Sequence, residues 1–411
     1  MVNQIIRYII ILLAVFVAAS YLPDLYWLSV SEPIRYPFVV YSPISETFVI
    51  GEIEDREFKW HDPVGNYFEL DEVDSLLPFF NYRQLAAKGK LPDSVKGLSI
   101  DVDNIRLNNF RQRIRPSSIE APQIGLYPLF ESNPPRLELE MPLTYFRISD
   151  RMEFIDAETN TIVDSLSNSF TDALEKIDFT FPARIIAGNP TTRKPFDEGY
   201  FIVDAEGQMY HVKMVNGMPV VRNTHIPDNI KVREIFVSES NLREFYGLLI
   251  SMDNNIYLIM YDGYRLQRLP VDQYNAFHDI LMFQGNLMYR IISITSENMM
   301  TTYVTNRGYE LIATHEESWE GRSDRLSGEI EKYLFPFSLS LQSRDRPYID
   351  FYFGPYHVSA LFLSIILTGI FLVLRRKNEN KINKLIDTLI ILVSGIFGFL
   401  AVLLIPDISK R

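Results

Sequence analysis

The chain has 411 residues, a net charge of −12 at pH 7 and no cysteine. The lack of cysteine excludes disulfides, thiol nucleophiles and cysteine-bound zinc or iron–sulfur sites. Eight of the 40 Lys and Arg residues and three of the 52 Asp and Glu residues lie in residues 1–22 or 357–411, so residues 23–356 carry a net charge of about −17. Nucleic-acid binding needs clustered positive charge, so the composition excludes nucleic acid as a partner.

The first apolar stretch, residues 5–22, contains a single charge at Arg7. Two interpretations are open. A positive residue, a short apolar core and the small residues at 18–20 are typical of a cleaved signal peptide. An uncleaved transmembrane anchor is the alternative, with the Arg7 side chain extending towards water and aromatic residues 21, 26 and 27 at the membrane interface. Either interpretation sends the following residues out of the cytoplasm.

Residues 30–150 are rich in proline, which cannot donate to a strand ladder and disrupts helix interiors. We therefore expect an irregular β region here. Short strands fit residues 38–41 and 48–51, and one short helix fits residues 78–87.

Residues 151–350 contain a repeat of apolar strand, polar turn, tyrosine-bearing strand and an X-Gly pair. The tyrosines fall at 210, 257 and 303, and the glycines of the X-Gly pairs fall at 217, 263 and 308. X-Gly pairs supply the positive φ that tight hairpins need, so we expect turns at 216–217, 262–263 and 307–308. A period in the forties is typical of propeller blades, and a plain antiparallel meander is the alternative. The expected fold class is an all-β outer domain, with transmembrane helices at the chain ends.

Two apolar runs of membrane-spanning length, 357–374 and 385–405, flank a basic loop at 375–384. About 20 residues of helix cross a bilayer core near 30 Å thick. Five Lys or Arg residues against one acid predict a cytoplasmic loop, with the large domain and the C-terminus outside. Ser394 and Gly398 form a small-xxx-small pair that predicts close helix packing. The protein is thus expected in a membrane, in contact with the lipid bilayer.

Five sequence strings resemble an uncharacterised bacterial membrane-protein family, classed only as a domain of unknown function. These strings are LPFFNYRQL (77–85), LPDSVKG (91–97), LYPLFES (126–132), FTFPARI (179–185) and FDEGYFIVD (196–204). The resemblance implies an N-terminal hydrophobic segment, a large outer domain, C-terminal spans and genes beside those of ABC-type transporters. It implies no catalytic residues, and it makes the expected membrane a bacterial inner membrane.

One basic run stands out within the acidic region. If residues 110–115 are extended, Arg111, Arg113 and Arg115 project to one side, where guanidinium groups suit phosphate or carboxylate partners. They are our candidate interaction patch, and pairing with neighbouring acids is the structural alternative.

Other chemistry is less well supported. The acids at 69–74 and at 101 and 103 could form a glycosidase or calcium site, and the structural alternative is a solvated acidic face. A copper site could be formed by Met209, His211, Met214 and Met218, and the structural alternative is a methionine-rich core. Phosphate-binding and serine-hydrolase motifs are absent from the sequence. We therefore expect no cofactor, no metal and no catalytic residue.

The expected function is a non-enzymatic accessory or interaction subunit of an ABC-type transporter or envelope complex, with transporter subunits as partners. The alternatives are a carboxylate-based envelope hydrolase and a ligand-binding sensor.

Overall fold

A computed structural model describes residues 2–30, 36–54, 57–136, 138–322, 324–342, 349–375 and 381–405. The chain divides into two compact units. We call residues 37–317 the β unit, and residues 1–36 together with 318–411 the helical unit. The boundary expected near residue 150 lies inside a sheet, because β9 (Thr144–Ile148) and β10 (Met152–Asp156) pair as a hairpin across it.

Antiparallel sheets make up most of the β unit, as the sequence predicted, and we number the five largest. Sheet 1 contains β1–β4, sheet 2 β8–β10, sheet 3 β11–β14, sheet 4 β15–β18, and sheet 5 β19–β22 with β7 at one edge. The remaining bounds are β1 Phe38–Tyr41, β2 Phe48–Glu54, β3 Glu57–His61, β4 Tyr67–Phe68, β7 Phe110–Ile114, β8 Tyr127–Pro128, β11 Ile185–Gly188, β12 Tyr200–Val203, β13 Met209–Val215, β14 Met218–Asn223, β15 Val232–Val237, β16 Phe245–Ser251, β17 Ile256–Met260, β18 Leu266–Arg268, β19 Ile280–Gly285, β20 Arg290–Thr295, β21 Met299–Thr305 and β22 Leu311–Ser318. A small ribbon pairs β5 (Ser94–Val95) with β6 (Leu98–Ser99).

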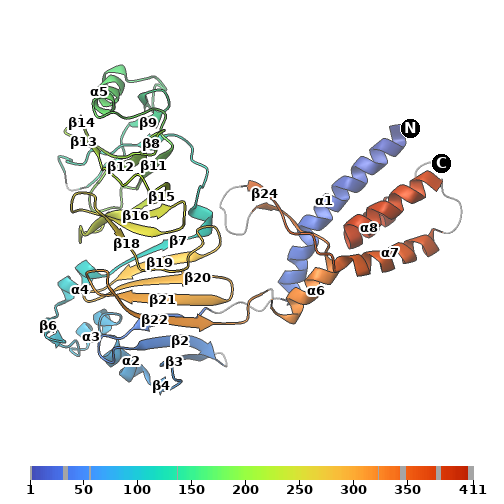
Figure 1. The fold of residues 1–411 in the computed structure, drawn as a ribbon, viewed down its shortest axis with the longest axis horizontal. Helices are drawn as coiled ribbons and strands as arrows, with labels where there is room; N and C mark the ends of the chain where they lie inside the picture. The colour runs from blue at the N-terminus through green and yellow to red at the C-terminus, as the bar shows by residue number, and fades with distance from the viewer. Residues whose placement is uncertain are drawn as a thin grey trace. The chain divides into compact units, whose positions relative to one another are not determined.

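The sheets lie in a row in Figure 1, from sheet 2 at one end through sheets 3, 4 and 5 to sheet 1 at the other. Strand β12 shows how they pack. Because alternate residues of a strand point to opposite faces, Tyr200 and Ile202 enter the core shared with sheet 2, whereas Phe201 and Val203 enter the core shared with sheet 4. A strand buried on both faces therefore has a continuous apolar sequence.

The hairpin turns expected from the X-Gly pairs are present. β13 pairs with β14 through Asn216 and Gly217, whose φ angles of 52° and 72° fit a tight two-residue turn. Gly263, with a φ of 62°, lies between β17 and β18. Gly308 lies between β21 and β22, but the positive φ of that turn is at Tyr309 and not at the glycine, which corrects the expectation for this pair.

In two of these hairpins a tyrosine follows the glycine and contacts the preceding sheet. Tyr264 and Tyr309 both have positive φ, of 61° and 65°. The Tyr264 hydroxyl lies 3.0 Å from Nδ1 of His211 in sheet 3, and the Tyr309 hydroxyl donates to Glu244, which directly precedes β16 in sheet 4. The repeat thus contains a recurring polar contact between neighbouring sheets.

Four α-helices interrupt the β unit: α2 (Leu70–Leu76), α3 (Tyr82–Ala87), α4 (Val102–Asn108) and α5 (Asp164–Glu175). The short helix predicted over 78–87 is thus present as α3. The other three correct the expectation of an all-β region. α5 buries Phe170 and Leu174 against sheets 2 and 3, and that tertiary core stabilises a helix that the neighbouring strand repeat obscured.

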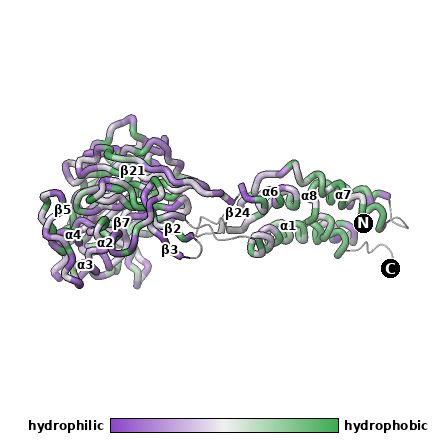
Figure 2. Tube along the Cα trace, turned by 90° about the horizontal axis from the view of Figure 1, so that it is seen from below, coloured by the Kyte–Doolittle hydropathy of each residue, from purple (hydrophilic) through white to green (hydrophobic). Residues whose placement is uncertain are grey.

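The helical unit contains α1 (Val2–Val30), α6 (Leu326–Leu334), β23 (Leu339–Gln342), β24 (Ile349–Phe353), α7 (Ala360–Leu374) and α8 (Lys381–Leu404). One face of α1 is buried at every fourth residue, at Arg7, Ile11, Val15 and Ala19. The last turn of α1 contacts α6, since Trp27 Nε1 donates to Glu331 over 2.6 Å. Figure 2 shows hydrophobic residues concentrated along α1, α7 and α8.

Helix α8 reverses direction at Gly395, whose φ of 55° and ψ of −129° are not helical. A straight helix would separate Asp387 from Ile405 by about 27 Å. Both instead contact Arg7: its Nη1 and Nη2 donate to the Asp387 carboxylate over 3.0 and 2.8 Å, and its Nε donates to the Ile405 carbonyl over 3.3 Å. A Cβ atom placed on Gly398 would lie 2.8 Å from the Ile390 carbonyl oxygen. The two halves of α8 therefore form a helical hairpin.

Two helices, Gln4–Val30 and Lys381–Leu404, are long and apolar enough to cross a membrane by length and composition. The reversal corrects the expected continuous helix over 385–405, because it leaves two shorter segments. α7 has 15 residues. Half of the predicted basic loop, residues 376–380, lies outside the described residues.

Candidate functional site

The candidate patch lies on β7, which pairs with β19 at the edge of sheet 5. Arg111 and Arg113 occupy alternate exposed positions, while Gln112 between them is less exposed and Ile114 after them is buried. Arg115 is also exposed, but it follows the strand and precedes a short 3₁₀ helix. The structure thus places two of the three arginines on one strand face and the third beside it.

The three arginines have no carboxylate partner within 4 Å among the residues that the structure describes. Arg111 instead directs its Nε towards the sulfur of Met282, 3.0 Å away. The structural alternative of a strand face paired with neighbouring acids therefore does not describe this patch. Solvent-exposed guanidinium groups remain available to an anion.

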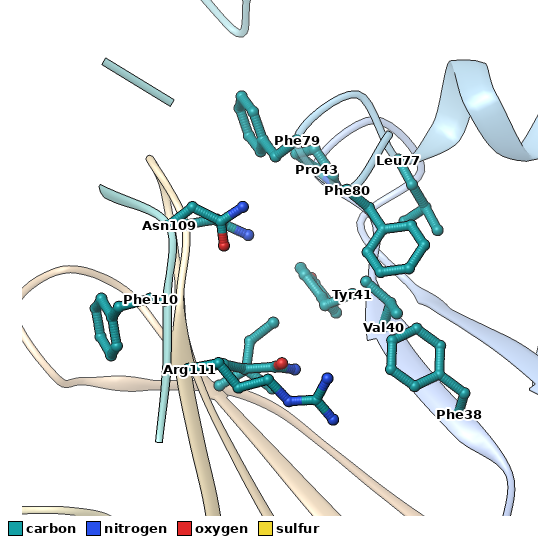
Figure 3. Close-up of a pocket in the computed structure, with 14 residues that line it drawn as sticks. Phe38, Val40, Tyr41, Pro43, Leu77, Phe79, Phe80, Asn109, Phe110 and Arg111 are labelled. Atoms are coloured by element: carbon teal, nitrogen blue, oxygen red, sulfur yellow. The ribbon is translucent and has the colours of Figure 1, made fainter. Parts of the chain in front are cut away.

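A pocket of about 220 Å³ lies between sheet 1 and the β7 edge of sheet 5 (Figure 3). One wall is aromatic, with Phe38 and Tyr41 from β1 and Phe79 and Phe80 from the segment before α3. The Arg111 side chain projects from the opposite wall towards them (Figure 3).

The polar side of the pocket is made by the residues around β7 and the end of β19. Asn109, Arg111 and Gln284 line it with amide and guanidinium groups. An adjoining pocket shares Phe80 and Asn109 and is also lined by Arg83. An apolar group that carries or adjoins an anion fits this combination, because aromatic surfaces desolvate it while guanidinium groups bind its charge.

The string LPFFNYRQL therefore contributes Leu77, Phe79 and Phe80 to the first pocket and forms most of the second. The sequence alone does not show that this string lies near β7, because the two segments meet only in the folded structure.

The acidic clusters serve local structure. Glu69 and Glu72 form the capping box of α2, and Asp101 accepts from the Asn104 backbone N–H over 2.8 Å as the N-cap of α4. Asp74 accepts from the side-chain amide of Asn81. Within the described residues, no group of three or more His, Cys, Asp or Glu side chains could hold a metal ion.

A buried ionic cluster between sheets 3 and 4 was not foreseen. Lys194 Nζ donates to Asp197 over 2.6 Å and to Glu239 over 2.9 Å, and all three side chains are at most 2% exposed. Ser132 donates to Asp197 over 2.6 Å. Asp197 belongs to the string FDEGYFIVD, which was the only sequence signal. Charges this buried need full pairing, so we assign the cluster a structural role.

His211, the residue behind the copper alternative, belongs to the adjoining polar contacts. Its Nε2–H donates to the Glu198 carbonyl over 2.5 Å, its Nδ1 accepts from Tyr264, and its ring stacks on Phe201 with centroids 4.4 Å apart. Burial lowers the pKa of His211 to about 4. Both ring nitrogens are thus engaged by protein groups, which leaves neither for a metal.

Ser394 and Gly398, the expected packing pair, are both buried in α8. The Ser394 hydroxyl donates to the Ile390 carbonyl over 2.6 Å, and Gly398 lies against Ile390 across the reversal. The pair thus allows the two halves of α8 to approach each other.

Comparison with known proteins identifies one family. Residues 38–305 match the family described as "Domain of unknown function (DUF4857)". The chain belongs to this family. The matched range includes β7 and both walls of the aromatic pocket, so the candidate site lies inside the family domain. A search of curated proteins finds no match.

Among solved structures, the chain is similar to the β-propeller domain of Myceliophteria thermophila Cps50 (Swd1), at 9% identity and a TM-score of 0.19, over 49% of this chain and 90% of that one. It is also similar to dihydro-heme d1 dehydrogenase NirN in complex with DHE, at 8% identity and a TM-score of 0.20, over 66% of this chain and 76% of that one. Similarity at this level carries no argument about function.

Proposed function

We propose that this member of the family is a non-enzymatic interaction protein, anchored in a bacterial inner membrane, whose β unit faces away from the cytoplasm. Its partners are subunits of an ABC-type transporter or a similar envelope complex. The observation that carries the proposal is the patch of exposed arginines on and directly after β7, beside the aromatic pocket, which have no carboxylate partner among the described residues. Sheets 1 to 4 are short antiparallel meanders, and sheet 5 is a meander with β7 added at its edge. Together they supply a propeller-like scaffold for that surface.

The anchoring part of the proposal rests on α1. This helix continues through residues 18–20, where a signal peptidase would cut, and ends at Val30. Arg7 and Ala19, at most 1% exposed, both belong to its packed face. Cleavage after Ala19 would remove a face that is buried in the helical unit. The contacts therefore favour the uncleaved anchor over the signal peptide.

The reversal in α8 changes the topology that we propose. Arg7, Asp387 and Ile405 lie together, which supports the N-terminal end of α1 and both ends of α8 on one side of the membrane. The positive charges at 375–384 favour the cytoplasm for that side. On this proposal α1 crosses the membrane, as does the apolar run 357–374 that contains α7, while α8 enters and returns as a re-entrant hairpin.

Acidic residues from both clusters serve as helix caps. They therefore give no support to the alternative of a carboxylate-based hydrolase. The interaction function is tested by purifying the full chain in mild detergent and quantifying co-purified proteins by mass spectrometry. We expect the ATPase and permease subunits of one ABC-type transporter to be enriched over an unrelated membrane bait. Their absence from the wild-type preparation would overturn the proposed partner.

The matched comparison removes the same number of exposed positive charges from another part of the β unit. The variant Arg111→Gln, Arg113→Gln, Arg115→Gln should lose most of the transporter signal. The control Arg193→Gln, Arg265→Gln, Arg307→Gln removes three exposed arginines elsewhere in the β unit and should retain it. Equal retention by both variants would exclude the β7 patch as the contact surface.

A further inference from the structure

Strand β7 has one partner strand and one open edge. It pairs with β19 from Phe110 to Ile114, and it is the terminal strand of sheet 5. Among the described residues, no other backbone group bonds to the main chain of β7. An open edge presents unpaired N–H and C=O groups that template the pairing of a further strand.

The charge on this edge is opposite to that of the rest of the unit. Arg111 and Arg113 are exposed on β7, and Arg115 follows directly, whereas residues 23–356 carry a net charge of about −17. Basic side chains on an open edge repel basic strands, and the overall negative charge disfavours acidic segments elsewhere on the unit. The β7 edge is thus electrostatically selective for an acidic strand.

The aromatic pocket adjoins the same edge. Asn109, Phe110 and Arg111 line it from β7 and the preceding residue, and the partly exposed Phe80 lines it from the opposite wall. A strand lying along β7 would therefore have a site for an apolar side chain near Arg111. Strand addition gains affinity from main-chain hydrogen bonds and specificity from such pockets.

We infer that β7 binds an extended acidic segment of a partner protein by strand addition, with carboxylates at Arg111 and Arg113 and an apolar side chain in the aromatic pocket. This inference rests on the proposed interaction function and names its mode. It differs from the alternative use of edge charges, in which arginines only prevent unwanted strand pairing.

The test uses short fluorescein-labelled peptides and the purified full chain in detergent, with binding read by fluorescence anisotropy. The first peptide alternates glutamate with valine around a central phenylalanine, and the second has lysine in place of glutamate. We expect the acidic peptide to bind and the lysine peptide not to bind. The triple change Arg111→Gln, Arg113→Gln, Arg115→Gln should weaken binding at least about tenfold, and the control triple at Arg193, Arg265 and Arg307 should not.

Two further arms test the mode. Two versions of the acidic peptide are N-methylated, one at the odd positions and one at the even positions. Because alternate N–H groups of a strand point to opposite edges, only one version loses the N–H groups that would face β7. We expect that version alone to lose binding. Phe80→Ala changes a partly exposed side chain. It should weaken binding of the peptide with the central phenylalanine, and it should leave binding of a peptide with alanine at that position unchanged.

The outcomes separate this inference from the proposed function. Equal affinity for acidic and lysine peptides, or full binding by both N-methylated versions, overturns strand addition. If the arginine triple nevertheless loses the transporter subunits, the interaction function stands with another binding mode. If peptide binding follows the expected pattern but no transporter subunit co-purifies, the mode stands and the partner proposal fails.

Discussion

Arg7 and Asp387 form a two-pronged ion pair, with Nη1 and Nη2 of the guanidinium 3.0 and 2.8 Å from the two carboxylate oxygens, across a separation of 380 residues. Their side chains are 1% and 3% exposed. The remaining Nε–H reaches the Ile405 carbonyl at the end of α8, where the helix dipole also favours a cation. One side chain of α1 thus contacts both halves of the α8 hairpin.

Neutralising one member of this pair should destabilise the helical unit. Asp387→Asn leaves a buried guanidinium without its counter-charge, and Arg7→Gln leaves a buried carboxylate, so each should cost about 3–5 kcal/mol. The double change Arg7→Met, Asp387→Leu removes both charges and should recover most of the loss. Thermal unfolding of the full chain in detergent measures the order of stability, in which the double variant should lie above both single variants.

The control for this series is Lys381→Gln, which removes an exposed charge at the start of α8 and should leave the midpoint unchanged. A double variant no more stable than either single variant would contradict the account of the pair as mutually compensating charges.

Gly395 should be sensitive to addition of a single methyl group. Its φ of 55° and ψ of −129° strain any residue that has a Cβ, and that atom would lie 3.0 Å from the Ser364 hydroxyl and 3.3 Å from Pro336. Gly395→Ala should therefore cost about 1–3 kcal/mol. Gly369→Ala in α7, where nothing lies within 4 Å, is the matched control and should be neutral or slightly stabilising. The two thermal midpoints, measured in one detergent, decide the matter; equal midpoints would contradict the reversal.

Stability should fall in mild acid because of His211. Its folded-state pKa of about 4 lies below its value in the unfolded chain, so the unfolded state binds the extra proton between these two pH values. The neutral histidine contributes fully above about pH 6.5, and about 3 kcal/mol is lost as the pH falls to about 4. His211→Gln, although less stable, should show a flatter profile in denaturant titrations between pH 7 and pH 4.

The control for the pH series is His225→Asn. His225 is exposed and has a φ of 52°, a conformation that asparagine tolerates. This variant should retain the wild-type dependence of the unfolding free energy on pH. If it flattens that dependence as much as His211→Gln does, the pH dependence is not specific to His211.

Local signals explain what the sequence predicted well. Asn216 and Gly217 both need positive φ, a demand that two adjacent residues reveal without any tertiary information. The strand predicted over 38–41 is β1, because a β-branched and aromatic run between prolines has few other solutions. The exposed positions of Arg111 and Arg113 follow from strand alternation alone.

The features that sequence reasoning missed depend on contacts between distant segments. Gly395 lies in an apolar run that reads as one span, and its reversal depends on packing against Pro336 and Ser364. Phe80 and Arg111 share a pocket because sheet 1 packs beside β7 and β19, which no local pattern encodes. α5 likewise depends on its buried Phe170.

The helical hairpin predicts an unusual topology, which cysteine labelling can test because the natural chain has no cysteine. Single cysteines replace Asp262 in an exposed turn, Lys381 at the start of α8 and Ser409 near the C-terminus. With an impermeant thiol reagent on intact spheroplasts, we expect the cysteine at 262 to react. Those at 381 and 409 should react only after permeabilisation, because both ends of α8 contact or adjoin the segment beside Arg7. A straight span over 385–405 would instead expose position 409 in intact spheroplasts while leaving 381 protected, and that pattern would overturn the re-entrant hairpin.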